Sequence, residues 1–207
     1  MVASISALVP VRCTLSRPRN GSDRMSFSDA KSATSEVLNP EIWRSWSEGP
    51  RWYFVLAAMI TDYRVEAYRE NIAADLGNAL QLTSPGQPHV SVRALGFKSW
   101  DWEPRTVELE VHAADTFSSA VYLRVKSSDI VRLQSELETS TVAFPSEDRK
   151  VPYVPHVTVG TYLRRVPLLT VKRLLAETTP LEPIRLTAEV RQVAVDTRSQ
   201  LGELRDP

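Results

Sequence analysis

Cysteine is nearly absent from this chain of 207 residues, because Cys13 is the single one. One cysteine excludes an internal disulfide and a zinc site built from cysteines, and it agrees with a reducing compartment. An excess of positive charge is also missing, since 25 lysines and arginines balance 25 aspartates and glutamates. We therefore expect no duplex DNA as a partner, and any nucleic-acid ligand should be a short end or a small nucleotide.

Long hydrophobic runs are missing too. None approaches the roughly 20 residues that a membrane-spanning helix needs, so we expect no membrane partner. Hydrophobic residues make up 43% of the chain and charged residues 24%, which is ordinary for a globular protein. The length favours one domain, which could consist of two similar halves, and we expect a monomer.

The N-terminal segment differs in composition from the rest. It is rich in serine and contains several arginines, and no acidic residue precedes Asp23. We expect residues 1–40 to be a disordered tail or a transit-like segment and residues 41–207 to form the domain. A cytoplasmic location is the default. A chloroplast or mitochondrion is the alternative if residues 1–25 are a transit peptide, and a start at Met25 is the third interpretation.

Hydrophobic periodicity and turn residues divide the remainder into strands and helices. Strands are expected at 51–60, 89–97, 105–113, 119–125, 156–163, 184–190 and 191–197, and helices at 63–80, 127–139 and 167–175. In this order each half carries one motif strand beside at least one helix. The fold class is therefore α+β, with two similar lobes that each have a mostly antiparallel sheet and outer helices.

One pentapeptide occurs twice. The chain has three histidines, and two of them lie in Pro-His-Val-Ser-Val at 88–92 and Pro-His-Val-Thr-Val at 155–159. The third, His112, lies on an alternating strand and is expected to be structural or exposed. A lone histidine in a strand carries little information, but the repetition of five positions favours a shared functional role for the pair.

Alternation along a strand decides which side chains of the motif act together. His89 and Ser91 share one face, and His156 and Thr158 share the corresponding face, while the valines point to the other side. Each motif thus holds an imidazole beside a hydroxyl on a rigid support. If the two halves face each other, one imidazole can act as base and the other as acid, and the hydroxyls can bind phosphate oxygens. This pattern suits displacement at phosphorus and needs no metal or other cofactor.

The same alternation adds three residues that we expect to contact substrate. Arg93 follows on the side of His89, where it could clamp a phosphate. Tyr162 continues the side of His156 and could stack on a base. Tyr153 precedes the second motif and is a further candidate for substrate binding.

Three alternatives remain open at this point. A zinc site is the main chemical rival, although neither motif has a cysteine or carboxylate at a suitable spacing. A non-catalytic module that binds nucleotides or RNA ends could use the same residues. An ordinary structural domain with an accidental repeat is the third.

The two motifs and their order resemble those of the two-histidine (2H) phosphoesterase superfamily, which includes the RNA 2′,3′-cyclic phosphodiesterases or 2′-5′ RNA ligases. "HVSVRALG" follows the family's first motif and "PHVTVG" its second, and "SAVYLRVKSSDIVRLQSELE" is similar to the strand and helix between them. The resemblance covers about residues 50–197. It implies a bilobal fold with a pseudo-twofold axis and a central cleft, with His89 and His156 as the acid–base pair.

The resemblance also implies roles for the hydroxyls and a class of substrates. Ser91 and Thr158 would bind the phosphate, and Ser91 stands where threonine is commoner. The family opens 2′,3′-cyclic phosphates and ADP-ribose cyclic phosphate and hydrolyses 2′-5′ oligonucleotides. We therefore expect a small cyclic nucleotide or an RNA 3′ end as ligand. Neither the physiological substrate nor the order of the acid and base roles follows from the resemblance.

Overall fold

The computed structural model describes residues 34–37, 48–82, 87–140, 153–178, 182–198 and 204–205. Its elements follow the chain in this order: β1 (Trp52–Met59), α3 (Tyr63–Leu76), the 3-10 turn η2 (Gly77–Ala79), β2 (Leu80–Leu82), β3 (His89–Gly96), β4 (Arg105–Thr116), β5 (Ala120–Lys126), α4 (Ser128–Ser140), β6 (His156–Tyr162), α5 (Leu168–Thr178), β7 (Ile184–Asp196) and β8 (Leu204–Arg205). The expected N-terminal transit-like segment lies almost entirely outside the described residues.

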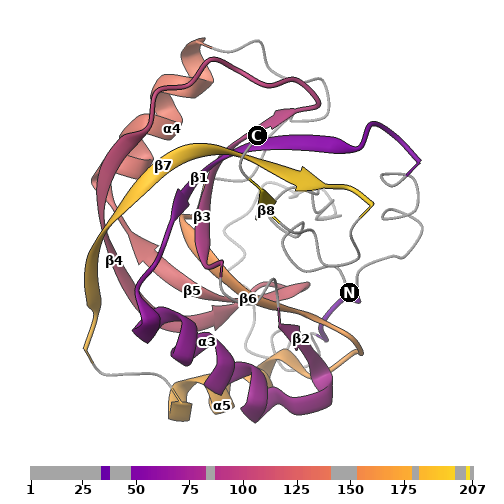
Figure 1. Ribbon diagram of the computed structural model, residues 1–207. Coiled ribbons are helices and arrows are strands. Elements are labelled where there is room, and N and C mark those ends of the chain that lie inside the picture. Colours follow the sequence, from indigo (N-terminus) through magenta and orange to yellow (C-terminus); the bar gives the residue numbers. More distant parts are fainter. Residues whose placement is uncertain are drawn as a thin grey trace, which may run out of the picture.

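The α+β class and the antiparallel pairing are confirmed. All of the described strand pairs are antiparallel, and α4 lies on one side of the strands while α3 and α5 lie together at another (Figure 1). The number of sheets differs from the expected two. The strands form one sheet in the order β1-β3-β6-β5-β4-β7-β8, and β1 also pairs with β7.

Long strands explain why the two halves share one sheet. The segments 184–190 and 191–197, expected as two strands, are the single strand β7. Its first part pairs with β4 and its second part with β1. In the same way, β4 pairs first with β7 and then with β5. A strand that passes from one half to the other joins their hydrogen-bonded ladders.

The helix expected at 63–80 is shorter than its hydrophobic pattern. Asp62 caps its first turn by accepting a hydrogen bond from the Arg64 N–H at 2.9 Å. Gly77 ends it with a φ of 52°, a backbone conformation that favours glycine. The chain then turns into β2, which pairs with the end of β6. The apolar residues up to Leu80 thus belong to a helix and a short strand.

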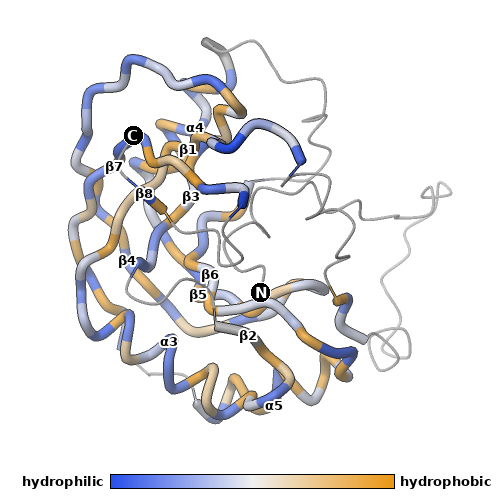
Figure 2. The backbone as a smooth tube through the Cα atoms, turned by 45° about the vertical axis from the view of Figure 1, so that its right-hand side comes forward, coloured by the Kyte–Doolittle hydropathy of each residue, from blue (hydrophilic) through white to orange (hydrophobic). Residues whose placement is uncertain are grey.

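The main hydrophobic core lies between the strands and the helices. It contains Val65 and Ile72 of α3, Ile130 and Leu133 of α4, and many strand residues. Hydrophobic and hydrophilic residues alternate along α3 and α5, as expected for helices that cover the core with one side (Figure 2). A smaller cluster on the opposite side of β1 includes Ala57.

The N-terminal boundary has one contact that the sequence did not indicate. Ser35, which the expected boundary at residue 40 places in the tail, is buried, and its N–H donates to the Val166 carbonyl at 2.8 Å. Its hydroxyl donates to the Arg164 carbonyl at 3.1 Å. The segment around Ser35 is therefore attached to the loop before α5.

Candidate active site

The two repeated motifs lie on neighbouring strands. Val90 of β3 is paired with Val157 of β6, and both valines are fully buried in the main core. Because side chains alternate along a strand, the histidine and hydroxyl residues on either side of these valines point away from the core together. We call this surface the site face. It carries His89, Ser91, His156 and Thr158.

The register also decides which groups are neighbours. In an antiparallel pair with Val90 opposite Val157, His89 lies across from Thr158 and Ser91 across from His156. The two histidines are then diagonal neighbours, which corresponds to a Cα separation of about 7–8 Å. Two imidazoles at this spacing can approach one phosphate from two sides.

Each imidazole is held by the same local hydrogen bond. Nδ1 of His89 lies 3.0 Å from the Gln87 carbonyl oxygen, and Nδ1 of His156 lies 2.7 Å from the Val154 carbonyl oxygen. A carbonyl can only accept, so Nδ1 is the protonated nitrogen and donates in both rings. Nε2 is consequently the atom that takes up or releases a proton in each.

Burial keeps both histidines neutral. It lowers the pKa of His89 from 6.5 to about 4, while the bond to Gln87 opposes the shift and the charges of Arg69 and His156 add to it. Arg69 is a buried residue of α3 that is paired with Glu66 at 2.8 Å. Burial also lowers the pKa of His156, against the opposing bond to Val154. At neutral pH each Nε2 of the free protein therefore carries a lone pair.

Both motif strands contain a bulge at the same position of the motif. On β1, the adjacent residues Ala57 and Leu56 pair with Ser91 and Arg93, which leaves Val92 as an extra residue. On β5, the adjacent residues Tyr122 and Val121 pair with Thr158 and Gly160, which leaves Val159 as the extra residue. Bulges of this kind are frequent next to active sites. The two motifs therefore share a backbone irregularity as well as an amino-acid sequence.

The bulges explain where two expected contact residues lie. Alternation alone puts Arg93 beside Ser91 and Tyr162 beside Thr158, but an extra residue reverses the faces beyond it. Arg93 is buried, and its Nη1 lies 3.9 Å from Glu138 of α4. Tyr162 is buried in the core, and its hydroxyl lies 2.5 Å from that of Thr116. The structure does not bring either residue to the site face.

Tyr153 lies beside the first motif and is bonded to its backbone. Its hydroxyl donates a hydrogen bond of 2.8 Å to the Ser91 carbonyl, and its ring packs against the main core. This bond ties the approach to the second motif to the strand of the first. Tyr153 thus has a position suited to holding the two motifs together.

The Tyr153→Phe variant is expected to lower the free energy of unfolding by about 1 kcal/mol, because one buried hydrogen bond is lost without a change of packing. Urea denaturation measures this. The control is Tyr63→Phe, which removes the hydroxyl of a side chain that is 79% exposed and should change little. Equal effects of the two substitutions would contradict the role given to the Tyr153 hydroxyl.

Two aromatic residues form a wall beside His156 that the sequence did not indicate. Phe117 and Tyr122 are stacked at 4.0 Å. Both rings meet the imidazole edge-on, with centroids at 5.1 and 5.4 Å. Tyr122 is the cross-strand partner of Thr158, so this contact depends on the register of β5 and β6. A single sequence contains no signal for that register.

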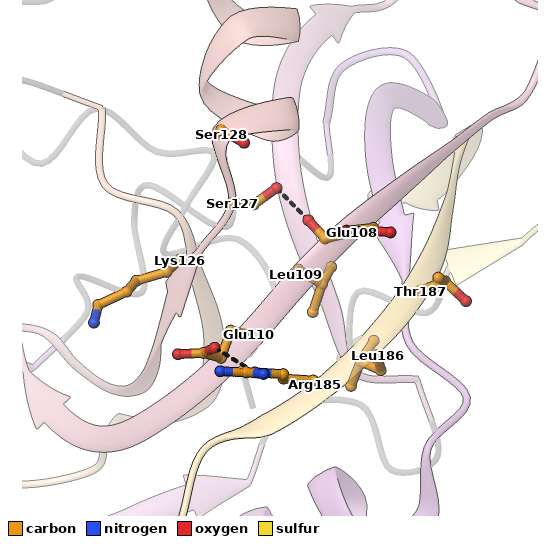
Figure 3. Close-up of a pocket in the computed structure, with 9 residues that line it drawn as sticks. All are labelled: Glu108, Leu109, Glu110, Lys126, Ser127, Ser128, Arg185, Leu186 and Thr187. Atoms are coloured by element: carbon orange, nitrogen blue, oxygen red, sulfur yellow. Dashed lines mark hydrogen bonds and ion pairs between the residues drawn. The ribbon is translucent and has the colours of Figure 1, made fainter.

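A hollow lies beside the strands β4, β5 and β7 (Figure 3). It is open, has a volume of about 660 Å³, and is lined by Glu108, Leu109, Glu110, Lys126, Ser127, Ser128, Arg185, Leu186 and Thr187. Arg185 and Glu110 form an ion pair across it at 2.9 Å. No residue of the two motifs lines this hollow.

Metal ligands do not cluster in the part of the chain that the structure describes. It contains no group of three or more histidine, cysteine, aspartate or glutamate residues that could hold a metal ion. No helix within the same residues combines the length and hydrophobicity of a membrane span.

Comparison with known proteins gives one family and two similar structures. The model of the 2′-5′ RNA ligase superfamily matches residues 97–199. TT0787 of Thermus thermophilus is 14% identical, with 69% of this chain and 87% of that chain covered and a TM-score of 0.46. LigT of E. coli, solved in complex with 3′-AMP, is 14% identical, with 76% and 94% covered and a TM-score of 0.49. Curated protein sequences contain no significant match.

The family match begins just after β3 and includes β4 to β7. It thus covers the second motif, the strand and helix before it and the bulge at Val159, and the first motif lies outside it. The resemblance recognised from the two motifs is confirmed. Over residues 97–199 this chain matches the 2′-5′ RNA ligase superfamily of two-histidine phosphoesterases.

Proposed function

We propose that the protein is a metal-independent phosphodiesterase that opens 2′,3′-cyclic phosphates or related cyclic and 2′-5′ phosphodiesters. The observation that carries the proposal is the paired arrangement of the histidines. Both Nδ1 atoms are bound to carbonyls of their own strands, and the two rings share one face. The match to the superfamily supports phosphodiester chemistry in general.

The reaction consists of one displacement at phosphorus. One Nε2 takes a proton from a water molecule, and the water oxygen forms a bond to phosphorus. The bond between phosphorus and one ribose oxygen breaks, and the other Nε2–H protonates that oxygen. Ser91 and Thr158 donate hydrogen bonds to the non-bridging oxygens, where negative charge must be stabilised.

We assign the acid and base roles from the pKa values and the substrate charge. His89 has the pKa of about 4, so it stays neutral over most of the pH range and is assigned as the base. His156 is also neutral in the free protein. The bound phosphate anion raises the pKa of a neighbouring imidazole, and His156 is protonated in the complex and acts as the acid.

A binding module is the second candidate function. The lowered pKa values of both histidines favour it, because two neutral imidazoles can accept hydrogen bonds from a ligand without transferring a proton. In that case the site would hold a nucleotide or an RNA end unchanged.

A substrate panel distinguishes the two functions. Hydrolysis of 2′,3′-cyclic nucleotides, 2′-5′ dinucleotides and ADP-ribose cyclic phosphate is measured in EDTA, with the double variant His89→Ala, His156→Ala as the control. We expect turnover of at least one class by the wild type only. Activity that disappears in EDTA and returns with zinc would contradict the metal-independent mechanism. Nucleotide binding without any turnover would establish the binding module.

A further inference from the structure

The two histidines have different neighbours on the outer strands. Met59 of β1 is the cross-strand partner of His89, and Arg124 of β5 is the partner of His156. The two positions correspond in the repeat, because β1 precedes the first motif strand as β5 precedes the second. One flank therefore has a thioether and the other a guanidinium. The site is chemically asymmetric although its motifs are nearly identical.

Arg124 lies on the site face. Its neighbours Leu123 and Val125 are buried in the main core, so alternation turns Arg124 to the side of Tyr122 and His156. Its side chain is exposed. Met59, in contrast, packs against the smaller apolar cluster. Within the described residues, the Arg124 guanidinium makes no ion pair, so its charge is available to a ligand.

The order of the strands separates Arg124 from the reacting phosphate. The strands β1, β3, β6 and β5 are successive neighbours in the sheet. In this order they place Met59, His89, His156 and Arg124 across the site face. In the proposed mechanism the reacting phosphate lies between the two imidazoles, where Ser91 and Thr158 contact it. Arg124 lies on the far side of His156 from the reacting phosphate. It can contact a part of the substrate that extends past His156.

We propose that Arg124 binds a second phosphate of the substrate, on the His156 side of the reacting one. A guanidinium can donate two parallel hydrogen bonds to a phosphate, which a methionine at the corresponding position cannot do. The preferred substrate class is then a nucleotide 2′,3′-cyclic phosphate with an additional phosphate group, as at an RNA end. This inference rests on the proposed phosphodiesterase function.

The test uses two substrates that differ in one group. Adenosine 2′,3′-cyclic phosphate has the reacting phosphate only, and its 5′-phosphorylated form has one more. Both are assayed with the wild type, Arg124→Gln and the matched control Lys126→Gln. Lys126 is an exposed cation two residues farther along the same face of β5, and it pairs with Glu110 of β4 instead of a motif residue.

We expect the wild type to prefer the 5′-phosphorylated substrate about 10-fold in kcat/KM, which is the effect of one charge-assisted contact. Arg124→Gln should abolish this preference through KM and leave turnover of the unphosphorylated substrate unchanged, whereas Lys126→Gln should keep the preference. An equal loss on both substrates, a preference that survives in Arg124→Gln, or a wild type without preference would overturn the inference. A wild type inactive on both, and on the wider panel, would instead refute the phosphodiesterase itself.

Discussion

Replacing either His89 or His156 by alanine is expected to lower kcat on the preferred substrate by about 10²–10⁴-fold, the usual contribution of a general acid or base. Each imidazole is the group whose free Nε2 moves a proton, because its Nδ1 is bound to a carbonyl of the same strand. KM should change much less, since Ser91 and Thr158 remain to bind the phosphate. Steady-state kinetics on the substrate identified by the panel measures both quantities.

His112 supplies the matched control. It is the third histidine of the chain, and it lies on β4, outside the two motifs, in contact with Glu110 at 2.6 Å. His112→Ala should retain wild-type turnover. The double variant at His89 and His156 should lose little more than one single variant, because groups that act as a unit are not additive. Full activity of either single variant would contradict the two-histidine mechanism.

A substrate with a better leaving group separates the acid from the base. A nucleoside 4-nitrophenyl phosphodiester releases nitrophenolate, which departs without receiving a proton. If the wild type accepts it, His156→Ala should be far less impaired on this substrate than on the natural ester, and His89→Ala should remain impaired. The reverse pattern would show that the roles of the two histidines are exchanged.

Acid is expected to destabilise the wild type between about pH 6.5 and 4, and His89 should be a main cause. Its pKa is about 4 in the folded protein, whereas the ordinary value, which applies to the unfolded chain, is 6.5. Between these values the unfolded chain binds the proton and the folded protein does not, so the free energy of unfolding falls as the pH falls. A shift of this size corresponds to at most about 3 kcal/mol. His156 adds to the loss in the same direction.

The variant His89→Gln isolates this contribution. Glutamine does not titrate, and its amide can still donate to the Gln87 carbonyl. Urea denaturation at intervals from pH 7 to 4 should show a shallower loss of stability in the variant than in the wild type. The pKa values of the carboxylates Asp62 and Asp196 are lowered from the ordinary value of 3.8. The stability that these two groups contribute is therefore lost only below this pH window. Parallel curves for the two proteins would contradict the burial of a neutral His89.

The predicted elements of the fold agree with the structure where the pattern is local. Strands and helices depend on apolar spacing and turn residues within a few positions, and all of the expected helices are present with altered ends. The pattern of apolar residues in 184–197 predicts two strands, whereas the structure has the single strand β7. One long strand that pairs first with β4 and then with β1 has the same apolar pattern as two shorter strands. The positive φ of Gly77, which ends α3, depends on how the next residues join β6.

The sequence by itself determined the family, the repeated motif and the side-chain direction over three residues of each motif. His89 with Ser91, and His156 with Thr158, share a face because alternation holds over one intervening valine. Only the tertiary structure decided what happens beyond that point. Pairing with β1 and β5 places Val92 and Val159 in bulges, and the bulges turn Arg93 and Tyr162 away from the site face.

The neighbours of the histidines were likewise decided by tertiary structure. Phe117 and Tyr122 meet His156, and Arg124 flanks it, because β5 pairs with β6 in one register out of several that its apolar pattern would allow. The lowered pKa values arise mainly from the burial of the two rings. Local spacing encodes which residues can do chemistry, whereas register and burial between distant strands decide which of them meet and in what protonation state.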